Sequence, residues 1–199
     1  MERKHRAWHR DWGESCAFLV VLALYFGVPN RYTLGGAETS LLLGILLAGA
    51  CGLSIAVTIA GSRRGTRIAM LCVAGVLMII LFASLSRIIY LVIYQASHVD
   101  GARLLASALV IWFANVMVFA IFYHWIGDDE FAFPEKAGVA PRHPVFLDFL
   151  FLSFTTATAF SPTDTPPLTT AARMLMMLES SVSLATIAIA AARAINILS

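Results

Sequence analysis

The chain has 199 residues, of which 59% are hydrophobic and 13% charged, and its formal net charge is +2. Soluble domains carry about 25% charged residues, so this composition indicates that lipid surrounds most of the chain. The small net charge gives no reason to expect nucleic acid as a partner. Its cysteines lie in or beside apolar runs without metal-ligand spacing, as buried apolar side chains do.

Five apolar runs are long enough to cross about 30 Å of hydrocarbon. They lack the period-2 alternation of barrel strands, so helices are expected. The runs are Glu14–Pro29, Glu38–Ala60, Arg67–Tyr94, Ala102–Ile126 and Ala171–Leu198. A sixth run, Val145–Ser161, is near the minimum length for a span and contains Asp148. We therefore predict an all-α membrane protein, a bundle of about six helices with five clear spans and one short pore-helix-like segment.

Three regions follow from the order of these runs. Residues 1–126 form a four-helix membrane region, and residues 127–144 form a connecting loop that is acidic at first and contains prolines later. Residues 145–199 hold the pore-helix-like segment, a polar loop and the last transmembrane helix.

Basic residues near the ends of the runs predict the orientation. They cluster before the first run and between the second and third, at Arg3, Lys4, Arg6, Arg10, Arg63, Arg64 and Arg67. Cytoplasmic segments carry such clusters, and two spans between them are self-consistent. We predict a multi-pass protein of the cell (inner, plasma) membrane with a cytoplasmic N-terminus.

Two charged residues lie inside the predicted spans, Arg87 and Glu179. Intramembrane charges are costly and usually pair or face a polar cavity. If Val145–Ser161 crosses the bilayer, the two charges reach similar depths and can pair, which favours six crossings and two cytoplasmic termini. If that segment re-enters instead, the two charges lie at opposite faces. A simpler interpretation of Arg87, whichever path holds, is that its side chain snorkels to the interface.

The C-terminal quarter resembles the pore segment of the potassium-channel superfamily. In the stretch FLDFLFLSFTTATAFSPTDTPP, six residues match the pore-helix and filter pattern: Ser153, Phe154, Thr155, Thr156, Thr158 and Asp164. The same stretch also resembles a family of bacterial multi-pass membrane proteins of unassigned function. The channel resemblance covers about fifty residues and implies a pore helix, a filter loop and an inner helix.

The filter glycines of that superfamily are missing, because the aligned positions hold the residues Ala159 to Thr163. A carbonyl-lined filter needs the unusual φ values that glycine permits, and Pro162 fixes φ near −65°. Potassium selectivity is therefore not expected. A simpler interpretation is a polar hairpin between two helices, in which Thr169 or Thr165 caps the second helix.

Two functions are compatible with the sequence. One is a degenerate channel-like pore for small ions, formed by a homo-oligomer, with Glu179 and Asp164 favouring cations. Its pathway would be lined by the polar loop residues Thr155, Thr156, Thr158, Ser161, Thr163 and Asp164. The other is a non-conducting membrane scaffold or regulatory protein. No catalytic motif, metal-ligand spacing or cofactor loop is present, so an enzyme is not expected.

Overall fold

The computed structural model of the protein describes residues 52, 63–94, 101–134, 143–158 and 165–198. This part of the chain contains four α-helices, where about six were predicted for the whole chain, together with one short 3₁₀ helix. In chain order they are α3 (Arg63–Tyr94), α4 (Gly101–Ile126), η2 (Asp128–Glu130), α5 (Phe146–Ala157) and α6 (Thr170–Leu198). The first two predicted spans, 14–29 and 38–60, lie outside the described residues except for Gly52.

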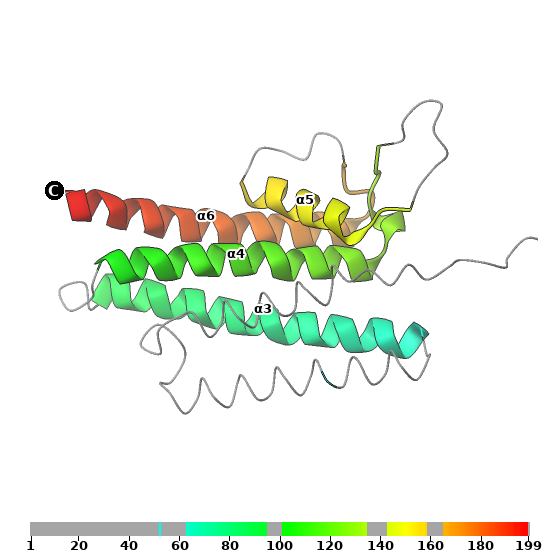
Figure 1. The fold of residues 1–199 in the computed structure, drawn as a ribbon, viewed down its shortest axis with the longest axis horizontal. Helices are drawn as coiled ribbons and strands as arrows, with labels where there is room; N and C mark the ends of the chain where they lie inside the picture. The colour runs from blue at the N-terminus through cyan, green and yellow to red at the C-terminus, as the bar shows by residue number, and fades with distance from the viewer. Residues whose placement is uncertain (1–51, 53–62, 95–100, 135–142, 159–164, 199) are drawn as a thin grey trace, which may run out of the picture.

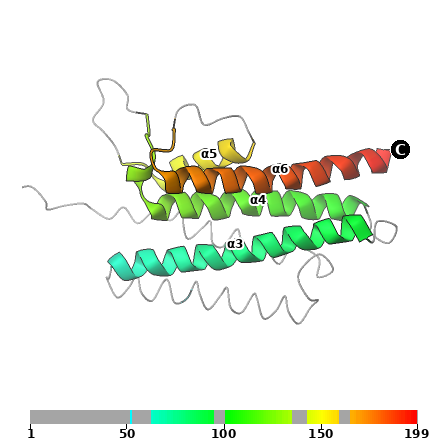
Figure 2. The same ribbon diagram turned by 180° about the vertical axis from the view of Figure 1, so that it is seen from behind.

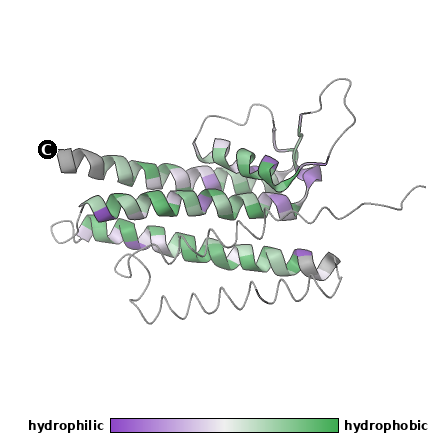
Figure 3. Cartoon of the chain, viewed as in Figure 1, coloured by the Kyte–Doolittle hydropathy of each residue, from purple (hydrophilic) through white to green (hydrophobic). Residues whose placement is uncertain are grey.

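Three of these helices confirm a membrane protein. Within them, Arg67–Tyr94, Gly101–Ile126 and Thr170–Ala192 are long and apolar enough to cross a bilayer. Figure 3 shows that most positions coloured along these helices are hydrophobic and few are hydrophilic.

The three long helices lie side by side, and α4 runs antiparallel to both α3 and α6 (Figures 1 and 2). One apolar cluster joins all three through residues such as Leu85, Leu104 and Val182. A second cluster joins α4, α5 and α6 through Phe119 and Phe149. Helix α4 is therefore the central element against which the others pack.

The end of α4 is fixed by glycine and arginine. Gly127 has φ 119°, a conformation that residues with a Cβ rarely adopt, and it ends the helix after Ile126. The guanidinium of Arg67, near the start of α3, donates to the carbonyl oxygens of Trp125 (3.0 Å) and Ile126 (2.6 Å). These bonds satisfy two carbonyls that have no partner within the helix and place a positive charge at its negative end.

Helix α6 begins beside the end of α4. The chain after η2 pairs with the chain before α6, since Ala132 N–H donates to Pro166 O (3.0 Å) and Leu168 N–H donates to Glu130 O (2.9 Å). Thr169 is the expected N-cap of α6, because its hydroxyl accepts a hydrogen bond from the backbone N–H of Ala172 (3.2 Å). The same hydroxyl donates to the Glu130 carboxylate.

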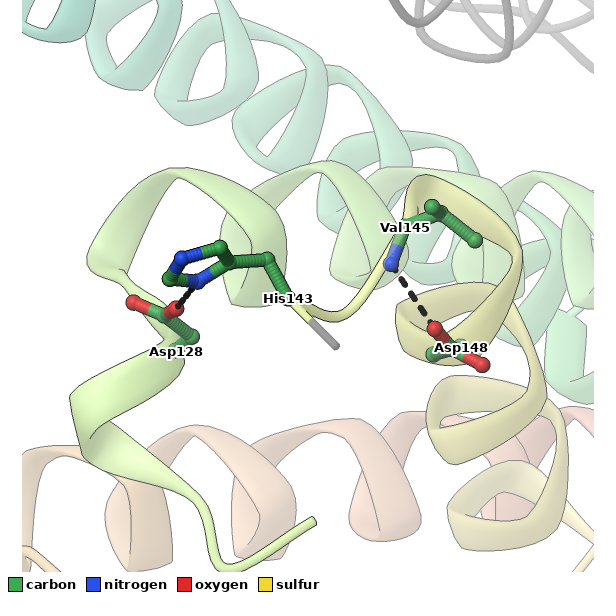
Figure 4. A network of polar contacts seen from close by, with 4 residues as sticks. All are labelled: Asp128, His143, Val145 and Asp148. Carbon is green, nitrogen blue, oxygen red and sulfur yellow. Dashed lines mark hydrogen bonds and ion pairs between the residues drawn. The ribbon is translucent and has the colours of Figure 1, made fainter. Parts of the chain in front are cut away.

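Helix α5 begins at the same end of the bundle (Figure 4). Asp148 accepts a hydrogen bond from the Val145 amide (2.7 Å), which satisfies a free N–H at the helix start. His143, just before α5, contacts Asp128 of η2 (3.3 Å). The starts of α5 and α6 and the end of α4 therefore lie together.

Helix α5 re-enters the bundle and does not cross it. Its 12 residues span about 18 Å, well short of the hydrocarbon thickness. Its last carbonyl, that of Ala157, accepts from Ser183, about 20 Å along α6 from the start of that helix. Helix α6 begins at the end of the bundle where α5 also begins, so both ends of α5 are placed without a crossing (Figure 1). The interpretation of Val145–Ser161 as a sixth crossing is therefore wrong.

Cysteine accessibility in intact cells checks this topology. In a cysteine-free background, single cysteines at His143 and Thr170 should react with a membrane-impermeant reagent only after the cytoplasmic side is exposed, as should one at Ser62. A cysteine at Ala102, at the other end of α4, should react from outside. Reaction of the cysteines at positions 143 and 170 from opposite sides of the membrane would show that α5 crosses the bilayer.

Candidate functional site: a buried carboxyl beside the re-entrant helix

The side chain of Glu179 lies where α4, α5 and α6 meet, and its residue is 0% exposed. One carboxyl oxygen, Oε1, is hydrogen-bonded to the Ser153 hydroxyl of α5. The other, Oε2, accepts from the Tyr123 hydroxyl of α4. Ser153 also contacts the carbonyl of Val116 in α4 at 2.7 Å. This group of three side chains, Tyr123, Ser153 and Glu179, is called the carboxyl cluster below.

Helical periodicity brings the carboxyl cluster together. Along α6, the buried positions Met176, Glu179, Ser183 and Thr186 recur every three or four residues and form one stripe. Side chains of antiparallel helices lean toward their own N-termini, so Tyr123 and Glu179 lean toward each other from α4 and α6.

The surroundings of the carboxyl cluster are apolar. The ring of Tyr123 packs in an aromatic and aliphatic cluster, in which Phe131, Phe149 and Met176 are also buried. Among the described residues, no arginine, lysine or histidine forms an ion pair with Glu179. An intramembrane carboxyl of this kind depends on hydroxyl partners instead of an opposite charge.

A second polar group lies deeper in the bundle, at the C-terminal end of α5. The indole N–H of Trp112 donates to the Ser183 hydroxyl at 2.7 Å, and that hydroxyl donates to the carbonyl of Ala157. The Ser180 hydroxyl donates to the carbonyl of Thr156 at 3.4 Å. Helix α6 therefore donates hydrogen bonds to the last two carbonyls of α5, at an end where helix carbonyls lack the usual helical partner.

The side chain of Asn115, in α4, contacts the backbone of α6, and the residue is 0% exposed. Its amide nitrogen donates to the backbone carbonyl of Glu179 at 3.4 Å. Its Oδ1 has no hydrogen-bond partner in the described part of the chain.

The predicted loop residues fall into two groups. Ser161, Thr163 and Asp164 lie outside the described residues. The other three belong to the last turns of α5, and each hydroxyl donates to a carbonyl of that helix: Thr155 and Thr156 to Leu152, and Thr158 to Phe154 and Thr155. In this structure the hydroxyls of the three threonines are engaged within the protein.

The structure does not bring Arg87 and Glu179 together. Arg67 and Thr169 both contact the chain around the end of α4. From that end, Arg87 lies about 30 Å along α3 and Glu179 about 15 Å along α6. The guanidinium of Arg87 lies over the Tyr90 ring, 5.7 Å from its centroid. The predicted pair is therefore absent, because it required α6 to begin at the opposite end of the bundle.

Sequence reasoning named Glu179 but missed its partners. A tyrosine near a span end, such as Tyr123, is normally an interfacial anchor, and Ser153 is singled out in the sequence only by the channel resemblance. Trp112 and Asn115 both carry polar groups and lie in the middle of the predicted span Ala102–Ile126. Polar groups at such depth need partners inside the protein, which is the signal that could have found them.

Comparisons with known proteins add no relative: no family model, no curated protein and no solved structure matches the chain.

Replacing Ser183 with alanine tests the cap on α5. The substitution leaves the Trp112 N–H and the Ala157 carbonyl without a partner, and each unsatisfied buried group costs about 1–3 kcal/mol. We expect a clearly lower unfolding temperature in detergent. The matched control is Ser181→Ala, whose exposed hydroxyl bonds only to its own helix, with a change within about 0.5 kcal/mol. Equal effects of the two substitutions would contradict the cap.

A double-mutant cycle tests the separation of the two charges. Because Arg87 and Glu179 do not touch, the unfolding free energies lost in Arg87→Ala and Glu179→Ala should add to within about 0.5 kcal/mol in the double variant. Unfolding in detergent, followed by circular dichroism, measures all three. A coupling free energy well above about 0.5 kcal/mol would show that the two side chains interact, as the sequence predicted.

Proposed function

We propose that the protein belongs to the transport class and provides a pathway for small cations, without potassium selectivity, in the cell (inner) membrane. The observation that carries the proposal is α5, which begins beside the start of α6, enters the bundle and stops beside the middle of α6. Non-helical backbone at membrane depth is tolerated only where protein buries it or where it lines an aqueous cavity. Helices that stop at the midplane are a recurrent way of building ion sites.

The charge distribution around α5 favours cations over anions. A helix carries a partial negative charge at its C-terminus, and the C-terminal end of α5 points into the bundle. The carboxyl of Glu179 lies on the inner side of the same helix, hydrogen-bonded to Ser153. Carboxylates are the side chains that cation pathways use.

The loop after α5 argues against a potassium filter. It contains Pro162 and none of the filter glycines at the aligned positions. Without them, successive carbonyl oxygens cannot all face one pathway. We therefore propose a weakly selective pathway, and we place its oligomeric contacts on the exposed apolar face of α5, which carries Leu147, Phe151 and Phe154.

A non-conducting scaffold is the second candidate, and one observation favours it. The hydroxyls of the carboxyl cluster, of Ser183 and of the three threonines of α5 are all hydrogen-bonded within the protein. Re-entry of α5 then serves packing alone, and no ion passes.

Flux measurements in liposomes separate the two candidates. The purified protein should pass sodium and potassium above protein-free liposomes, with a preference below about tenfold, which is about 1.4 kcal/mol. At alkaline pH, where the carboxyl has lost its proton, Glu179→Gln should lower the preference for cations over chloride, whereas Ser181→Ala should not. No flux of any small cation would support the scaffold, and strong potassium preference would contradict the argument from the missing glycines.

A further inference from the structure

We propose that Glu179 is a proton-binding site within the membrane, and that in this structure its carboxyl holds the proton and donates it to Ser153. The proposal rests on the hydrogen-bond geometry of the carboxyl cluster. It does not depend on whether the protein conducts ions.

The number of hydrogens available in the carboxyl cluster carries the inference. Three contacts are made: Tyr123 to Oε2, Ser153 to Oε1, and Ser153 to the carbonyl of Val116. Each needs one hydrogen between its two oxygens. The two hydroxyls supply one hydrogen each, and a carbonyl supplies none. With one hydrogen in each contact, and no other side-chain donor to these oxygens among the described residues, the third hydrogen lies on Glu179.

The donors and acceptors can then be assigned. Tyr123 donates to Oε2, Oε1 donates to the Ser153 hydroxyl oxygen, and Ser153 donates to the carbonyl of Val116. Every oxygen in the chain of contacts has a matching hydrogen. An ionised Glu179 leaves Ser153 with two acceptors for one hydrogen, so one contact between the helices is lost.

In the part of the chain that the structure describes, the groups that contact Glu179 carry no positive charge that could replace the proton. From α4 the only titratable side chain in contact with it is Tyr123, and from α5 it meets Ser153. Two acidic residues of neighbouring elements have partners of their own, since Asp148 bonds to a backbone amide and Glu130 to Thr169. A carboxylate in such surroundings is costly, and a bound proton removes that cost.

Release of the proton has a structural consequence. The O–H bond of the carboxylic acid breaks, its electron pair stays on Oε1, and the proton passes to water. The Ser153 hydroxyl then turns its hydrogen from the Val116 carbonyl to Oε1. The hydrogen bond from Ser153 to Val116, which holds α5 against α4, is then lost. The packing of α5 against α4 therefore depends on whether Glu179 holds its proton.

Infrared spectroscopy of the full chain in lipid nanodiscs tests the proposal. At neutral pH the wild type should show a carbonyl-stretching band of a carboxylic acid, and labelling glutamate with ¹³C should shift it. Glu179→Gln should remove the band. Glu130→Gln, a carboxyl at the end of the bundle, should leave it. Ser153→Ala should move it to higher frequency, because the acid loses the acceptor of its proton.

Each outcome of these spectra decides whether Glu179 holds a proton at neutral pH. A glutamic acid band that is lost in Glu179→Gln and shifted in Ser153→Ala supports the assignment. A neutral-pH spectrum of ¹³C-glutamate wild type with only carboxylate bands overturns it, even if Glu179→Gln fails to fold. A band that survives Glu179→Gln, or that Ser153→Ala does not move, also overturns it.

Discussion

A helix that ends inside a bilayer leaves its last carbonyls without water to bond, and this constraint explains the described part of the protein. Helix α5 stops beside the middle of α6, where an unpaired carbonyl is costly. Ser180 and Ser183 of α6 and Thr158 at the end of α5 donate to these carbonyls. The polar sequence ESSVS in an otherwise apolar helix is therefore what allows a half-length helix to pack there.

The same constraint decides what surrounds Glu179. Because α5 enters from the end where α6 begins, it places Ser153 level with Glu179 and far from Arg87. The carboxyl is then held by neutral hydroxyls, one from each neighbouring helix. A buried ion pair would have fixed its charge permanently, whereas hydroxyl partners leave a carboxyl free to gain or lose a proton. The path of α5 thus sets the chemistry available to the site.

Hydropathy alone predicted the three long described helices and their ends to within a few residues, because continuous apolar runs have one solution in lipid. It also found Glu179, the deepest charge of the last span. The path of Val145–Ser161 was predicted wrongly, because the argument assumed that two intramembrane charges must pair. A run near the minimum length is compatible with crossing and with re-entry, and the decision depends on tertiary hydrogen bonds such as Ser183 to Ala157.

The partners of Glu179 were beyond prediction for a related reason. Tyr123 and Ser153 lie 56 and 26 residues away along the chain, and they meet the carboxyl only once the direction of α5 is known. Tyrosine near a span end is normally an interfacial anchor, so its type gave a misleading signal. The buried stripe on α6 places Glu179, Ser183 and Thr186 on one face, and that face must meet polar groups. Once α5 is recognised as re-entrant, SFTT becomes the segment that supplies such a group at the right depth, whether or not an ion ever passes.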